Sequence, residues 1–114
     1  MPIRGTRYPF TLEGLRNAPP TTGVYCLWDG EELIYIGHTA GRTATILSLL
    51  TDHWFGVFGG CTQKATHFAF EVCPGRHITR EAELLEERQR VVGHVPRCHR
   101  VRHYAQGASR RDVD

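Results

Sequence analysis

The chain has 114 residues, of which 40% are hydrophobic and 23% charged, and its formal net charge is +2. This length allows one domain with one modest core. No apolar run approaches the roughly 20 residues of a membrane span, and the N-terminal residues 1–10 lack the apolar run of a secretory signal. We therefore expect a cytoplasmic protein without membrane association, in which disulfides between its four cysteines are not favoured.

The apolar pattern and the turn signals predict the following elements in chain order. An N-terminal segment covers residues 1–21 and contains a helical turn at 11–15. Strands are expected at 22–28 and 33–38, a helix at 43–54, a strand at 66–73, a helix at 80–92 and an extended segment at 96–103. The order β-β-α-β-α predicts an α+β domain over residues 22–104, with a small three-stranded, antiparallel-type sheet flanked by helices. Residues 105–114 are expected to form a basic, flexible tail.

Two short motifs, Gly23-Val24-Tyr25 and Tyr35-Ile36-Gly37, lie on the first two predicted strands. The turn-like Asp29-Gly30-Glu31-Glu32 between them predicts a hairpin. A regular pairing places the two tyrosines on opposite faces of the sheet, whereas an odd-length connection or a β-bulge places them on one face. The sequence leaves this choice open. Phenolic oxygens beside a hairpin can hold or deprotonate a water molecule at a phosphodiester.

Glu81 lies on the apolar side of the predicted 80–92 helix, whereas the other three glutamates of this helix lie on the opposite side. A carboxylate on the core-facing side needs a partner, because its desolvation costs several kcal/mol. Three partners fit the pattern. Glu81 reaches solvent at the helix N-terminus, forms a salt bridge with Arg88, or binds a divalent cation at the edge of the sheet.

The C-terminal part of the chain is strongly basic, with seven arginines and no carboxylate between residues 88 and 111. A segment of one charge sign suits a phosphate backbone, although a solvated tail has the same composition. The candidate nucleic-acid contacts are Arg88, Arg97, Arg100 and Arg102.

The tyrosine motifs and the helix carboxylate together resemble the GIY-YIG nuclease superfamily. The residues that carry the resemblance are Gly23-Val24-Tyr25, Tyr35-Ile36-Gly37, His53, the segment 80–85 around Glu81, and Pro96-Arg97-Cys98-His99. The resemblance covers roughly residues 22–99. It implies an α+β nuclease fold and a single Mg²⁺ or Mn²⁺ ion as cofactor.

The resemblance also implies a role for each matched position. Tyr25 would be the general base or would position the attacking water, and Tyr35 would support it. His53 would assist the nucleophile, and Glu81 would hold the cation. His38 and His99 would be polar supporting groups near the site.

Two positions depart from the family pattern. Members usually carry an arginine on the first helix, one turn before the histidine, and this position is Leu49 here. A leucine cannot donate to a phosphate, so Arg42, just before the helix, is the candidate replacement. The late asparagine of the family is His99, which can still donate a hydrogen bond or bind a metal.

We therefore expect a metal-dependent endonuclease that hydrolyses phosphodiester bonds in DNA rather than RNA. This function requires that the Tyr25 phenol and the Glu81 carboxylate converge on one water-filled pocket, and their placement on different sides of the sheet would speak against it. The alternative is a weakened member of the fold that binds nucleic acid or a protein without cleaving. A third reading is a Cys/His metal protein that uses Cys61, Cys73, Cys98 and neighbouring histidines.

Overall fold

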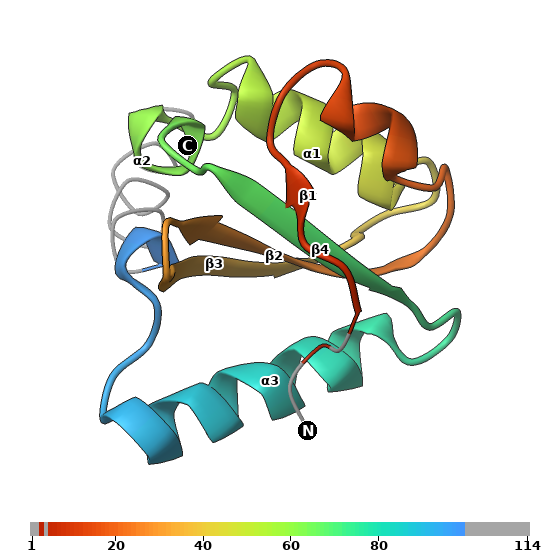
Figure 1. Ribbon diagram of the computed structural model, residues 1–114. Coiled ribbons are helices and arrows are strands. Elements are labelled where there is room, and N and C mark those ends of the chain that lie inside the picture. The colour runs from red at the N-terminus through yellow and green to blue at the C-terminus, as the bar shows by residue number, and fades with distance from the viewer. Residues whose placement is uncertain (1–2, 4, 100–114) are drawn as a thin grey trace, which may run out of the picture.

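A computed structural model describes Ile3 and residues 5–99. These residues form an antiparallel sheet with helices on both of its faces (Figure 1). The strands lie in the order β1-β4-β2-β3, so that β2 is central and β3 is an outer strand. The predicted α+β class is confirmed, but the sheet has four strands rather than three.

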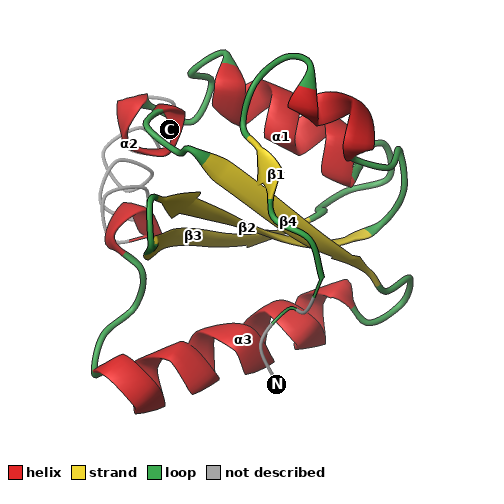
Figure 2. Cartoon of the chain, in the orientation of Figure 1, coloured by secondary structure: helices red, strands yellow, loops and turns green. Residues whose placement is uncertain are grey.

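Figure 2 distinguishes the helices from the strands along the chain. Their bounds are β1 Tyr8–Pro9, the 3-10 helix η1 Gly14–Asn17, β2 Gly23–Asp29, β3 Glu32–His38, α1 Ile46–Trp54, α2 Gly60–Gln63, β4 His67–Val72 and α3 His77–Val92. The predicted order β-β-α-β-α is not confirmed as it stands, because the structure also contains β1, η1 and α2. Residues 97–99 are helical, which corrects the extended segment expected there.

The β2–β3 hairpin contains a β-bulge that decides where the two tyrosines point. Trp28 pairs with Leu33, but the register shifts at the next residue, so that Leu27 pairs with Tyr35 and Tyr25 pairs with Gly37. Directly paired residues share a face. The bulge therefore brings Tyr25 and Tyr35 to the same face, which resolves the alternative that the sequence leaves open.

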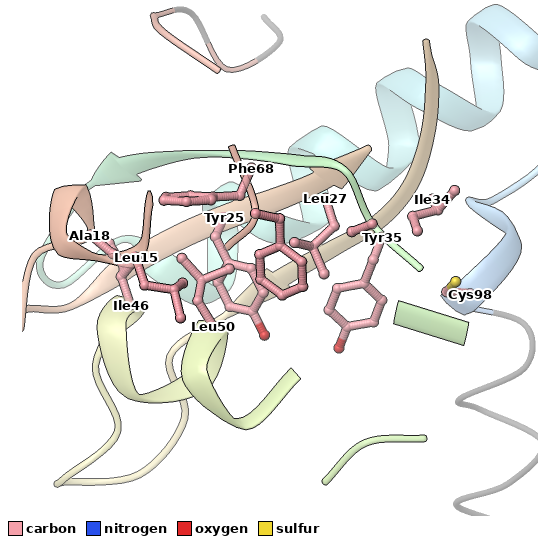
Figure 3. Packing of buried hydrophobic residues seen from close by; sticks show 12 residues of the cluster. Leu15, Ala18, Tyr25, Leu27, Ile34, Tyr35, Ile46, Leu50, Phe68 and Cys98 are labelled. Atoms are coloured by element: carbon pink, nitrogen blue, oxygen red, sulfur yellow. The ribbon is translucent and has the colours of Figure 1, made fainter. Parts of the chain in front are cut away.

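The sheet separates two apolar clusters. The larger cluster lies between the sheet and α1 and includes both tyrosines together with Leu27, Leu50 and Phe68 (Figure 3). The smaller cluster lies on the face that α3 covers and includes Val24, Cys26, Ile36 and Leu84. Successive residues of β2 thus contribute alternately to the two clusters, as the period of a strand requires.

Local sequence signals explain where the helices begin and end. Thr45 caps α1, because its hydroxyl accepts a hydrogen bond from the Ser48 N–H while the Ser48 hydroxyl accepts one from the Thr45 N–H. This capping box starts the helix at Ile46 rather than at residue 43. Gly93 ends α3 with a φ of 88°, a left-handed conformation that favours glycine.

The disulfide state of the cysteines differs from the expectation. Cys61 and Cys98 form a disulfide between α2 and the segment after α3, which overturns the sequence prediction that disulfides are not favoured. Cys26 and Cys73 are free. The third functional reading therefore loses two of the three thiols on which it depends.

No helix among the described residues is long and apolar enough to cross a membrane. Arg100, Arg102 and the predicted tail at 105–114 lie outside the described residues.

Candidate functional site

Three side chains that are linked by hydrogen bonds lie between the sheet and α1. Tyr25 Oη on β2 is 2.9 Å from His53 Nε2 on α1, and His53 Nδ1 is 2.8 Å from Thr62 Oγ1 on α2. Tyr25 is 2% exposed, His53 0% and Thr62 2%. Buried polar groups are costly unless they are paired. The hydrogen bonds between these three residues satisfy that requirement for both ring nitrogens of His53.

The absence of a side chain at Gly37 leaves room for the Tyr25 ring. A Cβ atom at residue 37 would lie 2.5 Å from Tyr25 Cζ and 2.6 Å from its Oη. No real side chain tolerates such distances, so the phenol of Tyr25 crosses β3 at a position that only glycine leaves open. The glycine of the second motif therefore has a steric role that depends on the tyrosine of the first.

Tyr35 is fully buried among the aromatic rings that surround these three side chains. Its ring centroid is 4.8 Å from that of His53 and 4.8 Å from that of His99, which stacks on it. His99 Nε2 also donates a hydrogen bond to the backbone carbonyl of Ile36. The predicted supporting histidine thus contacts both the second tyrosine and its strand.

Burial lowers the pKa of His53 from 6.5 to about 3. The imidazole is therefore uncharged at neutral pH. An uncharged imidazole has one nitrogen that donates and one that accepts, and both are engaged here by hydroxyl groups. The arrangement fixes the orientation of the Tyr25 hydroxyl, which is hydrogen-bonded to an uncharged imidazole.

Glu81 lies on the opposite side of the sheet. Its Oε1 is 3.0 Å from Nδ1 of His38, and the Glu81 side chain is 16% exposed. His38 Nδ1 is buried and makes no hydrogen bond of good geometry within the described chain, so the Glu81 carboxylate is the polar group that lies against it. The partner of Glu81 is therefore His38, not Arg88 and not solvent alone.

The expected convergence of Tyr25 and Glu81 on one pocket is wrong for this conformation. Tyr25 belongs to the cluster on the α1 side, whereas Glu81 is on α3 and contacts His38, which pairs with Val24 of the other cluster. The phenol and the carboxylate therefore approach the Gly37–His38 end of β3 from two faces. They form two separate polar groups at one end of an outer strand.

No family model matches this chain, and no curated protein is significantly similar to it.

The remaining predicted residues are dispersed. Arg42 is exposed in the loop before α1, whereas Leu49 packs against the larger apolar cluster. Arg97 contacts Asp29 at 3.2 Å and Glu32 at 3.0 Å, so that acidic partners already engage its guanidinium. Arg88 lines a mainly apolar cavity of about 130 Å³ beneath α3. These three predicted arginines therefore lie in three different surroundings.

The described part of the chain holds no group of three His, Cys, Asp or Glu side chains that could hold a metal ion. Glu81 alone among the predicted ligands fits a hard cation, because it is a partly exposed carboxylate.

The sequence pattern does not identify Thr62 as a site residue. Thr62 is the partner of His53 Nδ1 and lies on the short helix α2, in a glycine-containing stretch that carries no periodic apolar pattern. Its contact with His53 depends on the position of α2, so no local signal could identify it. The Phe58 ring also packs against this imidazole, with a distance of 4.6 Å between the ring centroids.

Proposed function

We propose that this protein is a divalent-cation-dependent endonuclease of the GIY-YIG type, which hydrolyses phosphodiester bonds in DNA. The observation that carries the proposal is the buried Tyr25–His53–Thr62 chain, with Gly37 left open for the phenol. A structural core can be filled by apolar side chains alone. A phenol held against an uncharged imidazole is instead suited to proton transfer to or from a reacting group.

The two polar groups at the end of β3 take different tasks in this proposal. Tyr25 positions the attacking water or accepts a proton from it, and His53 orients the Tyr25 hydroxyl through their hydrogen bond. Glu81 holds the cation, which supplies charge stabilisation at the phosphate when it is bound. His38 orients the Glu81 carboxylate, with which it is already in contact at 3.0 Å.

The burial of Tyr25 sets a condition on this mechanism. A phenol that is 2% exposed cannot meet a phosphate, so the residues around it must move before cleavage. The separation of Tyr25 and Glu81 on two faces adds a second condition, because one phosphate must contact both groups. These two conditions are the observations behind a second candidate function, a protein of the same fold that binds nucleic acid without cleaving it.

Cleavage of DNA in the presence of Mg²⁺ or Mn²⁺ tests the first function. The purified protein should nick supercoiled plasmid DNA, and Glu81→Ala should reduce the rate by about 10²-fold or more, because the cation loses its protein ligand. Glu86→Ala is the matched control, since Glu86 is on the same helix but its side chain is 80% exposed. Equal loss in both variants would indicate that α3 is disturbed rather than that a ligand is removed.

The absence of nicking with either cation would favour the second function. DNA binding would then be measured by fluorescence anisotropy as a function of salt, and it should weaken steeply and survive Glu81→Ala. Leu49→Arg separates the two functions. It restores a cationic group on α1, and it should raise cleavage if the remaining site is competent.

A further inference from the structure

We propose that the Cys61–Cys98 disulfide is a redox latch that keeps two segments closed over the rings of His53 and Tyr35, which flank the Tyr25 phenol, and that its reduction opens them. The two segments are residues 58–63 and 96–99, which we call the cover. The proposal deepens the proposed function, because the opening would give a phosphate access to Tyr25. Its structural part can be tested without any cleavage assay.

The disulfide joins segments that are far apart in the chain. Cys61 on α2 and Cys98 after α3 are 37 residues apart in sequence, and their Cα atoms are 5.6 Å apart. Cys98 is 1% exposed and belongs to the same apolar cluster as Tyr25 and Tyr35 (Figure 3). The bond therefore lies beside the tyrosines rather than at a remote edge of the fold.

Each cysteine directly precedes a residue that contacts the site. Thr62 follows Cys61 and bonds His53 Nδ1 at 2.8 Å. His99 follows Cys98, stacks on Tyr35 and donates to the carbonyl of Ile36. Breaking the disulfide therefore releases the two backbone segments that position these contacts.

The cover has little structure of its own to hold it closed. α2 has four residues, Gly60–Gln63, and a helix of one turn is unstable in isolation. The loop before it contains Gly56 and Gly59, with φ values of 80° and 99°. A short helix after a glycine-containing loop is held mainly by its tertiary contacts. The disulfide is the covalent one among them.

Reduction of the latch needs a dithiol as co-reactant. One thiolate of the dithiol attacks Sγ of Cys61, which is partly exposed, whereas Cys98 is buried. The S–S bond breaks, Cys98 leaves as a thiolate that takes a proton, and a mixed disulfide forms on Cys61. The second thiol of the reagent displaces Cys61, so that two electrons and two protons reach the protein and the reagent becomes a disulfide.

Hydrogen exchange followed by mass spectrometry tests the latch. The amides of residues 58–63 and 97–99 should exchange about tenfold faster or more after dithiothreitol treatment, because local opening no longer has to strain a cross-link. The double variant Cys61→Ser, Cys98→Ser should show the same increase without reductant. Cys73→Ser is the control, since Cys73 is a free thiol outside the cover, and it should leave the exchange unchanged.

Three results would overturn the latch. They are unchanged exchange in the cover after reduction, acceleration spread evenly over β2 and α3, and two free thiols at Cys61 and Cys98 in the untreated protein by alkylation mapping. If the double variant does not fold, the reduced wild-type protein provides the same measurement.

A cleavage assay in the oxidised and reduced states distinguishes the latch from the proposed function. If the protein is a nuclease, reduction should raise the nicking rate about tenfold, in step with the change in exchange. Faster exchange without nicking in either redox state keeps the latch and rejects the nuclease. Nicking that is equally fast in both states, together with unchanged exchange, rejects the latch and keeps the nuclease.

Discussion

Gly37 connects the two tyrosine motifs through space. Because a Cβ atom at this residue would overlap the Tyr25 ring, Gly37→Ala must displace the phenol from His53. We expect the free energy of unfolding to fall by about 1–3 kcal/mol, as overpacking usually costs. Urea unfolding measures this loss. Gly60→Ala is the matched control, since a Cβ at residue 60 meets nothing within 4 Å, and a comparable loss there would refute the steric argument.

His53 predicts a specific dependence of stability on pH. Its pKa is about 3 in the fold and 6.5 ordinarily, so below about pH 6.5 the unfolded chain binds a proton that the folded chain does not. The free energy of unfolding should therefore decrease as the pH is lowered. The decrease approaches about 1.4 kcal/mol per pH unit and amounts to about 2 kcal/mol between about pH 7 and about pH 5. The His53→Gln variant should lose this part of the slope in urea unfolding. Parallel slopes in the two proteins would show that His53 is not the group responsible.

At the residue scale, the sequence identifies candidates better than it identifies their contacts. Tyr25, Tyr35 and His53 are recognisable from their motifs and do meet in one cluster. The face on which the tyrosines lie depends on a bulge that shifts the register by one residue, and bulges leave no clear mark in a single sequence. The partner of Glu81 could not be inferred from the helix alone, because His38 comes from a strand.

The packing of α3 against the sheet includes a buried ion pair that links it to β4. The Arg80 side chain is 9% exposed and binds both carboxylate oxygens of Glu71, at 2.7 Å and 3.1 Å. Arg80→Ala should lower the free energy of unfolding by about 1–3 kcal/mol, because it leaves Glu71 without its partner. Arg80→Lys should recover only part of this loss, since an ammonium cannot bind in a bidentate manner.

Arg90→Ala is the control for that pair in thermal or urea unfolding. Arg90 and its partner Glu86 are mostly exposed and 3.8 Å apart, so their removal should change stability by less than about 0.5 kcal/mol. Equal losses in the Arg80 and Arg90 variants would show that α3 responds to lost charge in general rather than to the buried pair.

Among the elements, the long and strongly patterned ones could be predicted and the short ones could not. β2, β3, β4, α1 and α3 all lie close to their predicted ranges. β1 has two residues and contains a proline, so nothing in its sequence indicates a strand until it pairs with β4. α2 begins at a glycine pair and lies where the sequence indicates a loop. α3 begins at His77, three residues before the start expected at residue 80.

At the scale of the whole molecule, the disulfide closes a long loop and so restricts the unfolded chain. For a separation of 37 residues, the chain-entropy argument assigns it about 4 kcal/mol of stability. Unfolding in urea with and without reductant should differ by roughly this amount, and the Cys73→Ser variant should behave like the wild type. A difference below about 1 kcal/mol would mean that the oxidised and reduced unfolded chains are restricted to similar degrees.

The position of β3 at the outside of the sheet has a consequence for self-association. An outer strand offers unpaired backbone groups to any extended peptide, which is a common route to aggregation. Here His99 occupies the carbonyl of Ile36, and Arg97 binds acidic residues at both sides of the β2–β3 turn. The segment 97–99 therefore shields this strand from a foreign chain. The Cys61–Cys98 disulfide attaches this segment covalently to α2.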